Sequence, residues 1–200
     1  KVSFIDGTKT VMGLVASKGI NFPAGEFGIY NTKNLLKILG VLQSETDVSA
    51  SKDSIKFRDE SITASYVLAN PDIILEAPKA QNIPEPDFEF EINSIFIDQF
   101  IKSKSALDES TQFAFISEDG KVNLVLNHSE HPSDRITLKT GVEYDIESPI
   151  LFNSNFFKEI LLANKDMTSG KIFVSFAGLL ICQFQGEDIA SKYYLVAYQE

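Results

Sequence analysis

The chain has 200 residues, 44% of them hydrophobic and 23% charged, which supports a folded core and excludes a disordered tail. Its 28 acidic and 18 basic residues give a formal net charge of -10, which counts against a protein whose whole surface binds nucleic acid or an anionic membrane. The single cysteine excludes an internal disulfide and fits a reducing compartment. No apolar run has the roughly 18–20 residues that a transmembrane helix needs.

Short alternating runs of Phe, Val, Ile, Tyr and Thr predict that much of the chain is β-strand. The expected strands cover residues 11–16, 27–30, 54–57, 62–68, 112–116, 122–126, 136–138, 171–176, 179–184 and 193–198. Apolar residues that recur near every 3.6 positions predict three helices, at 31–42, 93–107 and 153–164. Because the first and third helices open with Asn followed by a hydroxyl residue, we expect Asn31 and Asn153 to be their N-caps.

The composition and the hydrophobic pattern of the chain change between residues 77 and 87. This stretch holds three prolines and has neither helical periodicity nor strand alternation. Such a composition predicts an extended, semi-rigid connector. We therefore expect a first domain at 1–76, the connector at 77–87 and a second domain at 88–200.

The two domains resemble copies of one unit. Residues 30–39 and 152–161 match at an offset of 122, with Asn, Ile and Leu identical at three positions. Runs of strands follow both segments, and a shared order of elements is the stronger sign of a repeat. The predicted helix at 93–107 has no counterpart in the first copy. We expect that the sequence as given starts inside the first domain, after its first strand and helix.

The lysines concentrate on the predicted helices. The windows 31–43, 94–106 and 153–165 hold six lysines, Lys33, Lys37, Lys102, Lys104, Lys158 and Lys165. Only two acidic residues, Asp98 and Glu159, accompany them. If the helices share one face, that face could follow a phosphate backbone while the rest of the surface repels it. Lysine also forms helices well and decorates solvated faces, and this pattern taken alone favours that alternative.

Arginine is nearly absent. Arg58 and Arg135 are the only two, and both fall in predicted strands. Specific readout of bases favours the bidentate fork of arginine, whereas lysine acts as a mobile point charge. If the lysines contact a nucleic acid, a track without arginine suits contact with any sequence.

No motif supports catalysis or a cofactor. His128 and His131 form a His-x-x-His pattern, but their context predicts a loop and no third metal ligand is evident. Cys182 lies in an apolar strand and is expected to be a small buried residue. The sequence contains no phosphate-binding loop, nucleophile elbow or zinc spacing. We therefore expect no enzymatic activity, no metal and no cofactor, with a carboxylate hydrolase as a remote alternative.

Several stretches resemble a known family. Residues 27–39 followed by 54–57, and residues 170–176 through 184–187, are similar to the DNA sliding clamp of T-even-type bacteriophages. The terminal run 192–195 and the pair Ile5-Asp6 before the strand 11–15 are similar to eukaryotic clamps. The resemblance implies an α+β fold of duplicated clamp domains, with antiparallel sheets outside and helices lining an inner face. It also implies that chains join head to tail into a homotrimeric ring.

The resemblance assigns residues to three surfaces. The six helix lysines would face DNA in the channel. A hydrophobic pocket for partner peptides would use Ile5, Met12, Ile83, Pro84, Tyr194, Val196 and Ala197. The junction between subunits would pair residues 62–68 of one chain with 135–139 of the next, and would use Ile62, Ala64, Tyr66, Ile136 and Leu138.

The function implied is that of a processivity factor. The ring would encircle double-stranded DNA without sequence specificity, tether the replicative DNA polymerase and be loaded by an ATP-driven clamp loader. A link to late-transcription factors is also implied, as is a location in the cytoplasm of an infected bacterial host, with no membrane partner. The alternative is a β-rich structural or virion-associated assembly protein with no role on DNA.

Overall fold

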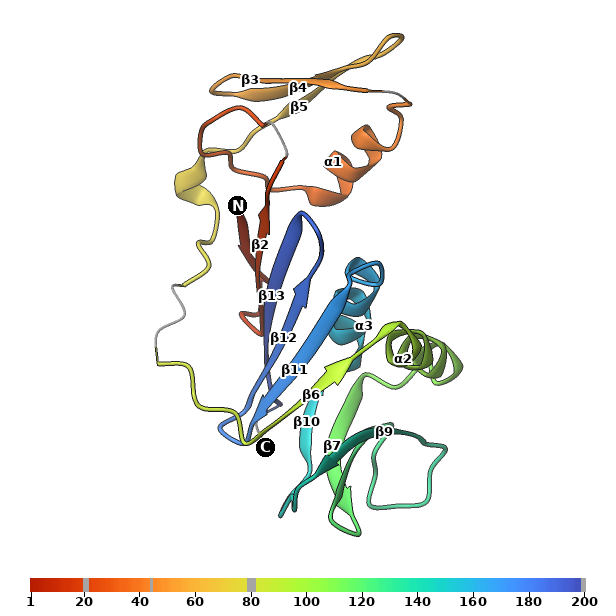
Figure 1. Cartoon of the computed structure of the whole chain (residues 1–200). Helices are drawn as coiled ribbons and strands as arrows, with labels where there is room; N and C mark the ends of the chain where they lie inside the picture. Colours follow the sequence, from red (N-terminus) through yellow and green to blue (C-terminus); the bar gives the residue numbers. More distant parts are fainter. Residues whose placement is uncertain (20–21, 44, 79–81, 199–200) are drawn as a thin grey trace. The chain divides into compact units, whose positions relative to one another are not determined.

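The computed structural model describes residues 1–19, 22–43, 45–78 and 82–198, and the chain folds into two compact units (Figure 1). We call Lys1–Lys18 together with Ala77–Glu200 the large unit, and Gly19–Glu76 the small unit. The division into domains at 1–76 and 88–200 stays a prediction. The N-terminal strands belong to the large unit by contact, whereas the sequence repeat assigns them to the first copy.

The large unit contains ten strands and two helices among the described residues. They are β1 (Val2–Ile5), β2 (Val11–Ser17), β6 (Phe88–Ile92), α2 (Ser94–Ala106), β7 (Gln112–Glu118), β8 (Lys121–Leu126), β9 (Ile136–Glu143), β10 (Ile150–Asn153), α3 (Ser154–Ala163), β11 (Ser169–Ser175), β12 (Leu179–Gln185) and β13 (Ile189–Val196). The small unit contains α1 (Thr32–Leu39), β3 (Asp47–Ala50), β4 (Ser54–Arg58), β5 (Thr63–Val67) and a single 3-10 turn at Pro71–Ile73. No described helix is long and apolar enough to cross a membrane.

The strands of the large unit form two antiparallel sheets. One has the order β1-β2-β13-β12-β11-β6 and the other the order β10-β7-β8-β9. In the first sheet β13, near the C-terminus, pairs with β2, near the N-terminus, with Tyr194 opposite Met12 and Tyr193 opposite Gly13. Alternate residues of each strand therefore face opposite sides of the sheet.

One side of the six-stranded sheet is covered by α2 and α3, and the main core lies between them. Leu180, Cys182 and Phe184 of β12 reach this core from the sheet. The two helices meet at Phe100 and Phe157, whose ring centroids lie 4.7 Å apart at 84°, an edge-to-face contact. This packing makes α2 and α3 one layer that depends on aromatic contacts.

Each of the three α-helices in the described residues begins with an asparagine cap. The side chains of Asn31 and Asn153 accept hydrogen bonds from the first-turn backbone, at Asn34 and at Phe156, so both predicted N-caps are confirmed. Asn93 caps α2 in the same way. Each cap satisfies a backbone donor that has no partner within its helix.

The small unit is a three-stranded sheet, β3-β4-β5, against which α1 packs. Its three fully buried hydrophobic residues are Ile55, Phe57 and Tyr66. The hydroxyl of Tyr66 donates to the carbonyl oxygen of Asn31 and so ties β5 to the start of α1. The small unit therefore rests on far fewer buried side chains than the large one.

The fold confirms the three predicted helices and corrects several strands. The expected strand at 27–30 is wrong, because Gly28 makes only an isolated bridge to Ala69. That approach is so close that a Cβ at Gly28 would lie 2.5 Å from the Ala69 carbonyl oxygen. The sequence analysis missed the strands Val2–Ile5, Asp47–Ala50 and Ile150–Asn153, which are only four residues long.

The order of elements occurs twice, as the sequence repeat predicts. A hairpin (β1–β2 or β8–β9), a helix (α1 or α3) and three antiparallel strands (β3–β5 or β11–β13) follow one another in both copies. The second copy adds β6, α2 and β7 before its hairpin, and β10 after it. The α+β fold of duplicated units is thus present in the structure.

Replacing Phe100 by Ala should lower the free energy of unfolding by about 3–5 kcal/mol, because it empties space between α2 and α3 that the core cannot refill. Urea denaturation followed by circular dichroism measures the change. The matched control is Phe176→Ala, at a position that is 38% exposed, which should cost much less. Equal losses for the two variants would contradict the packing described.

Candidate nucleic-acid and partner-binding surfaces

The small unit's helix carries lysines without acidic neighbours. Lys33 and Lys37 of α1 are both exposed, four positions apart, and α1 has no acidic residue. No described acidic side chain forms an ion pair with either of them. Residues four apart lie on the same side of a helix, so the two charges form one basic stripe.

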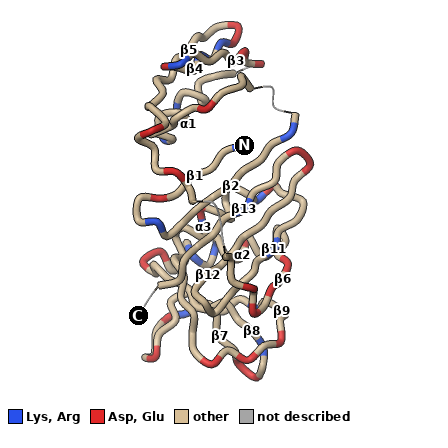
Figure 2. Tube along the Cα trace, turned by 90° about the vertical axis from the view of Figure 1, so that its left-hand side faces the viewer, with Lys and Arg blue, Asp and Glu red and all other residues tan. Residues whose placement is uncertain are grey.

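The helices of the large unit are close to neutral on their exposed faces. Lys102 of α2 and Lys165 just after α3 are exposed, and Lys158 of α3 is half-buried. The exposed acids Asp98 and Glu159 lie on the same two helices. Acidic residues are spread along the rest of the chain (Figure 2). The basic excess expected on the helices is therefore concentrated on α1.

Lys104 does not belong to the exposed set, which corrects its prediction as a DNA-facing residue. Its side chain is 1% exposed, and its ammonium donates to the carbonyl oxygen of Asp108 at 2.7 Å. Lys104 follows Phe100 by four positions and Ile97 by seven, which places it on the buried side of α2. Its ammonium lies at the C-terminal end of α2, where backbone carbonyl groups have no partner within the helix and favour a nearby cation.

The face of the six-stranded sheet opposite to α2 and α3, which we call the outer face, carries a second apolar cluster. Met12, Tyr194 and Ile181 occupy neighbouring strands at paired positions, and each is less than 10% exposed. Ala77, at the start of the connector, packs against them. We call Met12, Tyr194, Ile181 and the partly buried Leu14, Phe173, Leu179 and Ala77 the outer-face cluster.

The structure brings most of the predicted peptide-pocket residues to this side of the large unit. Ile5 is half-buried and pairs with Met12 in register. Val196 is 42% exposed, on the same face of β13 as Tyr194. Sequence reasoning missed Ile181. The alternation within 179–185 could have separated its outward residues from the core.

The predicted pocket residues of the connector and of the chain end lie in different surroundings. Ile83 is exposed and Pro84 is half-buried, in a segment without regular structure. Ala197 packs against the main core, so its assignment to the pocket is corrected. It follows Tyr193 and Leu195 in the alternation, on the side opposite to Tyr194.

Asp6 organises the turn between β1 and β2, next to the outer-face cluster. Its carboxylate accepts hydrogen bonds from the backbone N–H groups of Thr10 and Val11, both at 2.7 Å, and from the N–H and hydroxyl of Thr8. Burial raises the pKa of Asp6, but these hydrogen bonds outweigh it and hold the pKa below the ordinary value of 3.8. The turn is therefore held by an ionised side chain.

The two strands expected at the subunit junction are both edges. β5 ends the sheet of the small unit, and β9 ends the four-stranded sheet of the large unit. Ile62, Ala64 and Ile136 are half-buried. The side chains of Tyr66 and Leu138 are buried in their own units, which corrects their prediction as interface side chains. These two residues can reach a neighbour only through the backbone.

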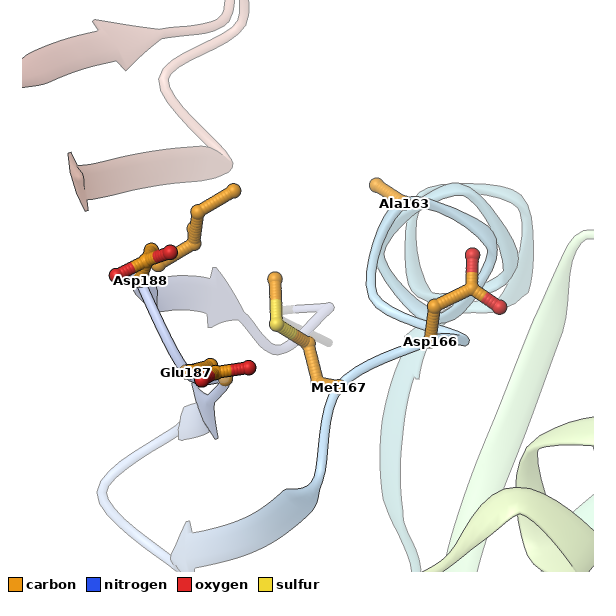
Figure 3. Close-up of a pocket in the computed structure, with 7 residues that line it drawn as sticks. Ala163, Asp166, Met167, Glu187 and Asp188 are labelled. Atoms are coloured by element: carbon orange, nitrogen blue, oxygen red, sulfur yellow. The ribbon is translucent and has the colours of Figure 1, made fainter. Parts of the chain in front are cut away.

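The remaining concave sites are small. One cavity of about 240 Å³ lies beside the end of α3, where Met167 points towards the space between Ala163 and Asp188 (Figure 3). Asp166 and Glu187 also line it, so its charge disfavours phosphate. No group of three or more His, Cys, Asp or Glu among the described residues could hold a metal ion. His128 and His131 lie in a loop, as predicted.

We compared the chain with known protein families, curated proteins and solved structures. No protein-family model matches the chain, and no curated protein does. Among solved structures, it is similar to the proliferating cellular nuclear antigen of Entamoeba histolytica, with 19% identity over 98% of this chain and 84% of that one and a TM-score of 0.67. The chain has the sliding-clamp fold.

Two further PCNA structures have the same fold. One is the PCNA of A. fulgidus with the C-terminal region of FEN-1 bound, at 16% identity and a TM-score of 0.68 over 99% of this chain and 84% of that one. The other is the PCNA2–PCNA3 complex of Sulfolobus tokodaii, at 16% identity and a TM-score of 0.69 over 99% and 85%. The clamp fold expected from the sequence is confirmed, while the likeness to phage clamps in particular stays a prediction.

Lys104 and Lys102 of this clamp-fold chain should respond differently to the same substitution. Lys104→Met keeps the apolar stem and removes the bond to Asp108, so it should lower the free energy of unfolding by about 1–2 kcal/mol. Lys102→Met, on the exposed face, should change it by less than about 0.5 kcal/mol. Chemical denaturation measures both. If Lys104→Met proves as harmless as Lys102→Met, the buried position of its ammonium is wrong.

Proposed function

We propose that the protein is a DNA sliding clamp, a ring without enzymatic activity that encircles duplex DNA and tethers a replicative polymerase. The observation that carries the proposal is a sliding-clamp fold over nearly the whole chain, with exposed lysines on its helices that form no ion pair among the described residues. Enclosure retains such a ring on DNA by topology, so strong phosphate binding is unnecessary and would slow sliding.

Ring closure follows from the repeat. Within the chain, β13, the last strand of the second copy, pairs with β2 in the hairpin of the first. The corresponding last strand of the first copy, β5, has an open edge, and so does β9, the hairpin strand of the second copy that corresponds to β2. Pairing β5 of one chain with β9 of the next repeats the internal junction between subunits and satisfies both edges. Heterologous contacts of this kind close into rings, and we propose a homotrimer.

Charge supports contact with DNA of any sequence. Lys33, Lys37, Lys102 and Lys165 are exposed point charges, and the chain as a whole carries a net charge of -10. Lysines screen phosphates without reading bases, and an acidic remainder disfavours DNA bound to the outside of the ring. Since α1 alone has basic residues without acidic ones, we expect it to contribute most of the attraction.

The outer-face cluster suits a short peptide from a partner protein. Met12, Ile181 and Tyr194 provide an apolar floor, and the adjacent connector exposes Ile83. Aromatic or aliphatic anchors buried on such a floor supply most of the affinity of peptide docking. We propose that the polymerase and an ATP-driven clamp loader bind here.

A T-even-like phage origin follows only from the sequence resemblance. It would place the clamp in the cytoplasm of the infected bacterium and add late-transcription factors to its partners. The same experiments on DNA apply to a clamp of any origin.

Retention on closed DNA tests the function. The protein loaded with a clamp loader should remain on nicked circular duplex in 0.5 M salt, and should leave within minutes once the circle is cut to a linear form. Sedimentation should give a mass of three chains. Loss from circular and linear DNA at the same rate would contradict enclosure and favour a structural assembly protein.

Reversing three helix charges should impair loading. The variant Lys33→Glu, Lys37→Glu and Lys158→Glu should reduce DNA-bound protein at least tenfold at low salt, since each lost phosphate contact weakens binding and makes its dependence on salt less steep. The trimer should persist. The matched control, Lys52→Glu, Lys56→Glu and Lys121→Glu, makes the same charge change on exposed lysines outside the helices. If the control loses as much, the helices do not face the DNA.

A further inference from the structure

Two lysines lie in one row on the outer face of the six-stranded sheet. Lys192 of β13 and Lys171 of β11 both pair in register with Gln183 of β12, so the three side chains share this face. The Lys192 ammonium lies 5.3 Å from the centroid of the Tyr194 ring. The Lys171 ammonium lies at the same distance from the Phe173 ring. Both rings belong to the outer-face cluster, so each ammonium lies at the border of that cluster.

The two lysines differ in their acidic partners. Lys171 forms an ion pair with Glu89 of β6, the strand that ends the sheet. Lys192 is half-buried, and no described acidic side chain forms an ion pair with it. An ammonium held on an aromatic ring and partly withdrawn from water attracts a carboxylate more strongly than an exposed lysine does, since solvent and salt screen it less. Lys192 is therefore a cation to which the described residues supply no carboxylate.

A hollow of about 180 Å³ opens beside Lys192. It is lined by two cationic side chains, Lys1 and Lys192, and by apolar ones that include Leu14 and Ala190. None of the described residues that line it is acidic. Leu14 also belongs to the outer-face cluster, so the hollow and the cluster are contiguous. The hollow thus combines an apolar wall with positive charge, in a chain whose formal net charge is -10.

We propose that this hollow is a specificity subsite for an aspartate or glutamate of the partner's peptide, whose carboxylate pairs with Lys192. The inference rests on the proposed docking of peptides on the outer-face cluster and adds a chemical requirement to it. Lys192 and Tyr194 are two positions apart on β13, which separates them by about 6–7 Å. In an extended peptide, the acidic residue should therefore lie two or three positions from the apolar anchor that packs on Tyr194.

A docked peptide suits the hollow better than the phosphate backbone of DNA. A phosphate backbone binds tracks of several cations, whereas this row ends at β6, where Glu89 and Glu91 pair in register with Phe173 and Lys171. A single ion pair at a surface holds a free acidic side chain only weakly. A peptide that is already anchored on the cluster keeps its carboxylate beside Lys192 at a high effective concentration. The pair then selects among peptides, because a basic residue at the same place meets like charge.

A library of random twelve-residue peptides, displayed on filamentous phage and selected on the full chain, supplies the probes. Selected peptides that lose binding to Tyr194→Ala or to Ile181→Ala, with the fold of each variant checked by circular dichroism, are those that dock on the outer-face cluster. Most of these peptides should carry Asp or Glu within three positions of their apolar anchor. Their affinities are measured by calorimetry in about 0.1 M salt.

Substitution on both sides of the contact tests the pairing. Lys192→Met, which keeps the apolar stem, should weaken the acidic peptides at least tenfold. A peptide whose acidic residue is replaced by lysine should bind Lys192→Glu at least tenfold more tightly than it binds the natural chain. The matched control is Lys171→Met, which removes the same charge from the same row. It should change affinity less than threefold, because Glu89 already pairs with Lys171.

The outcomes separate the subsite from the peptide site. The subsite is overturned if peptides that depend on the cluster show no preference for acidic residues and bind Lys192→Met as tightly as the natural chain, while docking on the cluster then stands. It is also overturned if Lys192→Met weakens peptides with and without an acidic residue equally, because the lysine would then act on something other than a carboxylate. If no selected peptide depends on the cluster, the peptide site is wrong and the subsite with it. Retention on nicked circular DNA tests the ring independently of all three results.

Discussion

The pairing of β13 with β2 is the contact on which the architecture of the large unit depends. It joins strands more than 170 residues apart in the chain into one six-stranded sheet and so unites the two copies of the repeat. The same pairing brings Tyr194 beside Met12 on the outer face and Tyr193 towards the core. A single register thus sets both the main core and the outer-face cluster, because slipping it by one residue would exchange the two faces.

The charge distribution fits a weak, mobile contact better than a tight one. The exposed faces of α2 and α3 carry acids beside their lysines, and only α1 is basic without compensation. A ring that encloses DNA needs no stronger electrostatic attraction than these lysines provide, since its retention does not depend on its affinity for DNA. Charge balance on two of the three described helices and an acidic remainder are consistent with the proposed sliding ring.

Local patterns in the sequence predicted local structure well and tertiary placement poorly. Helical periodicity and the caps Asn31 and Asn153 located the helices, because both signals act within a few residues. The burial of Lys104 escaped prediction, since charge suggests solvent and only the contact between α2 and α3 decides otherwise. Ile181 escaped too, because membership of the outer-face cluster depends on pairing between distant strands.

Cys182 lies wholly inside the main core, on the inner face of β12. Burial raises the pKa of its thiol well above the ordinary value, so almost no thiolate exists at neutral pH and the sulfur is shielded from reagents. The native chain therefore offers maleimides no reactive site while it stays folded. A single cysteine placed on any exposed strand or helix can carry a fluorophore or cross-linker selectively, without removal of the natural one.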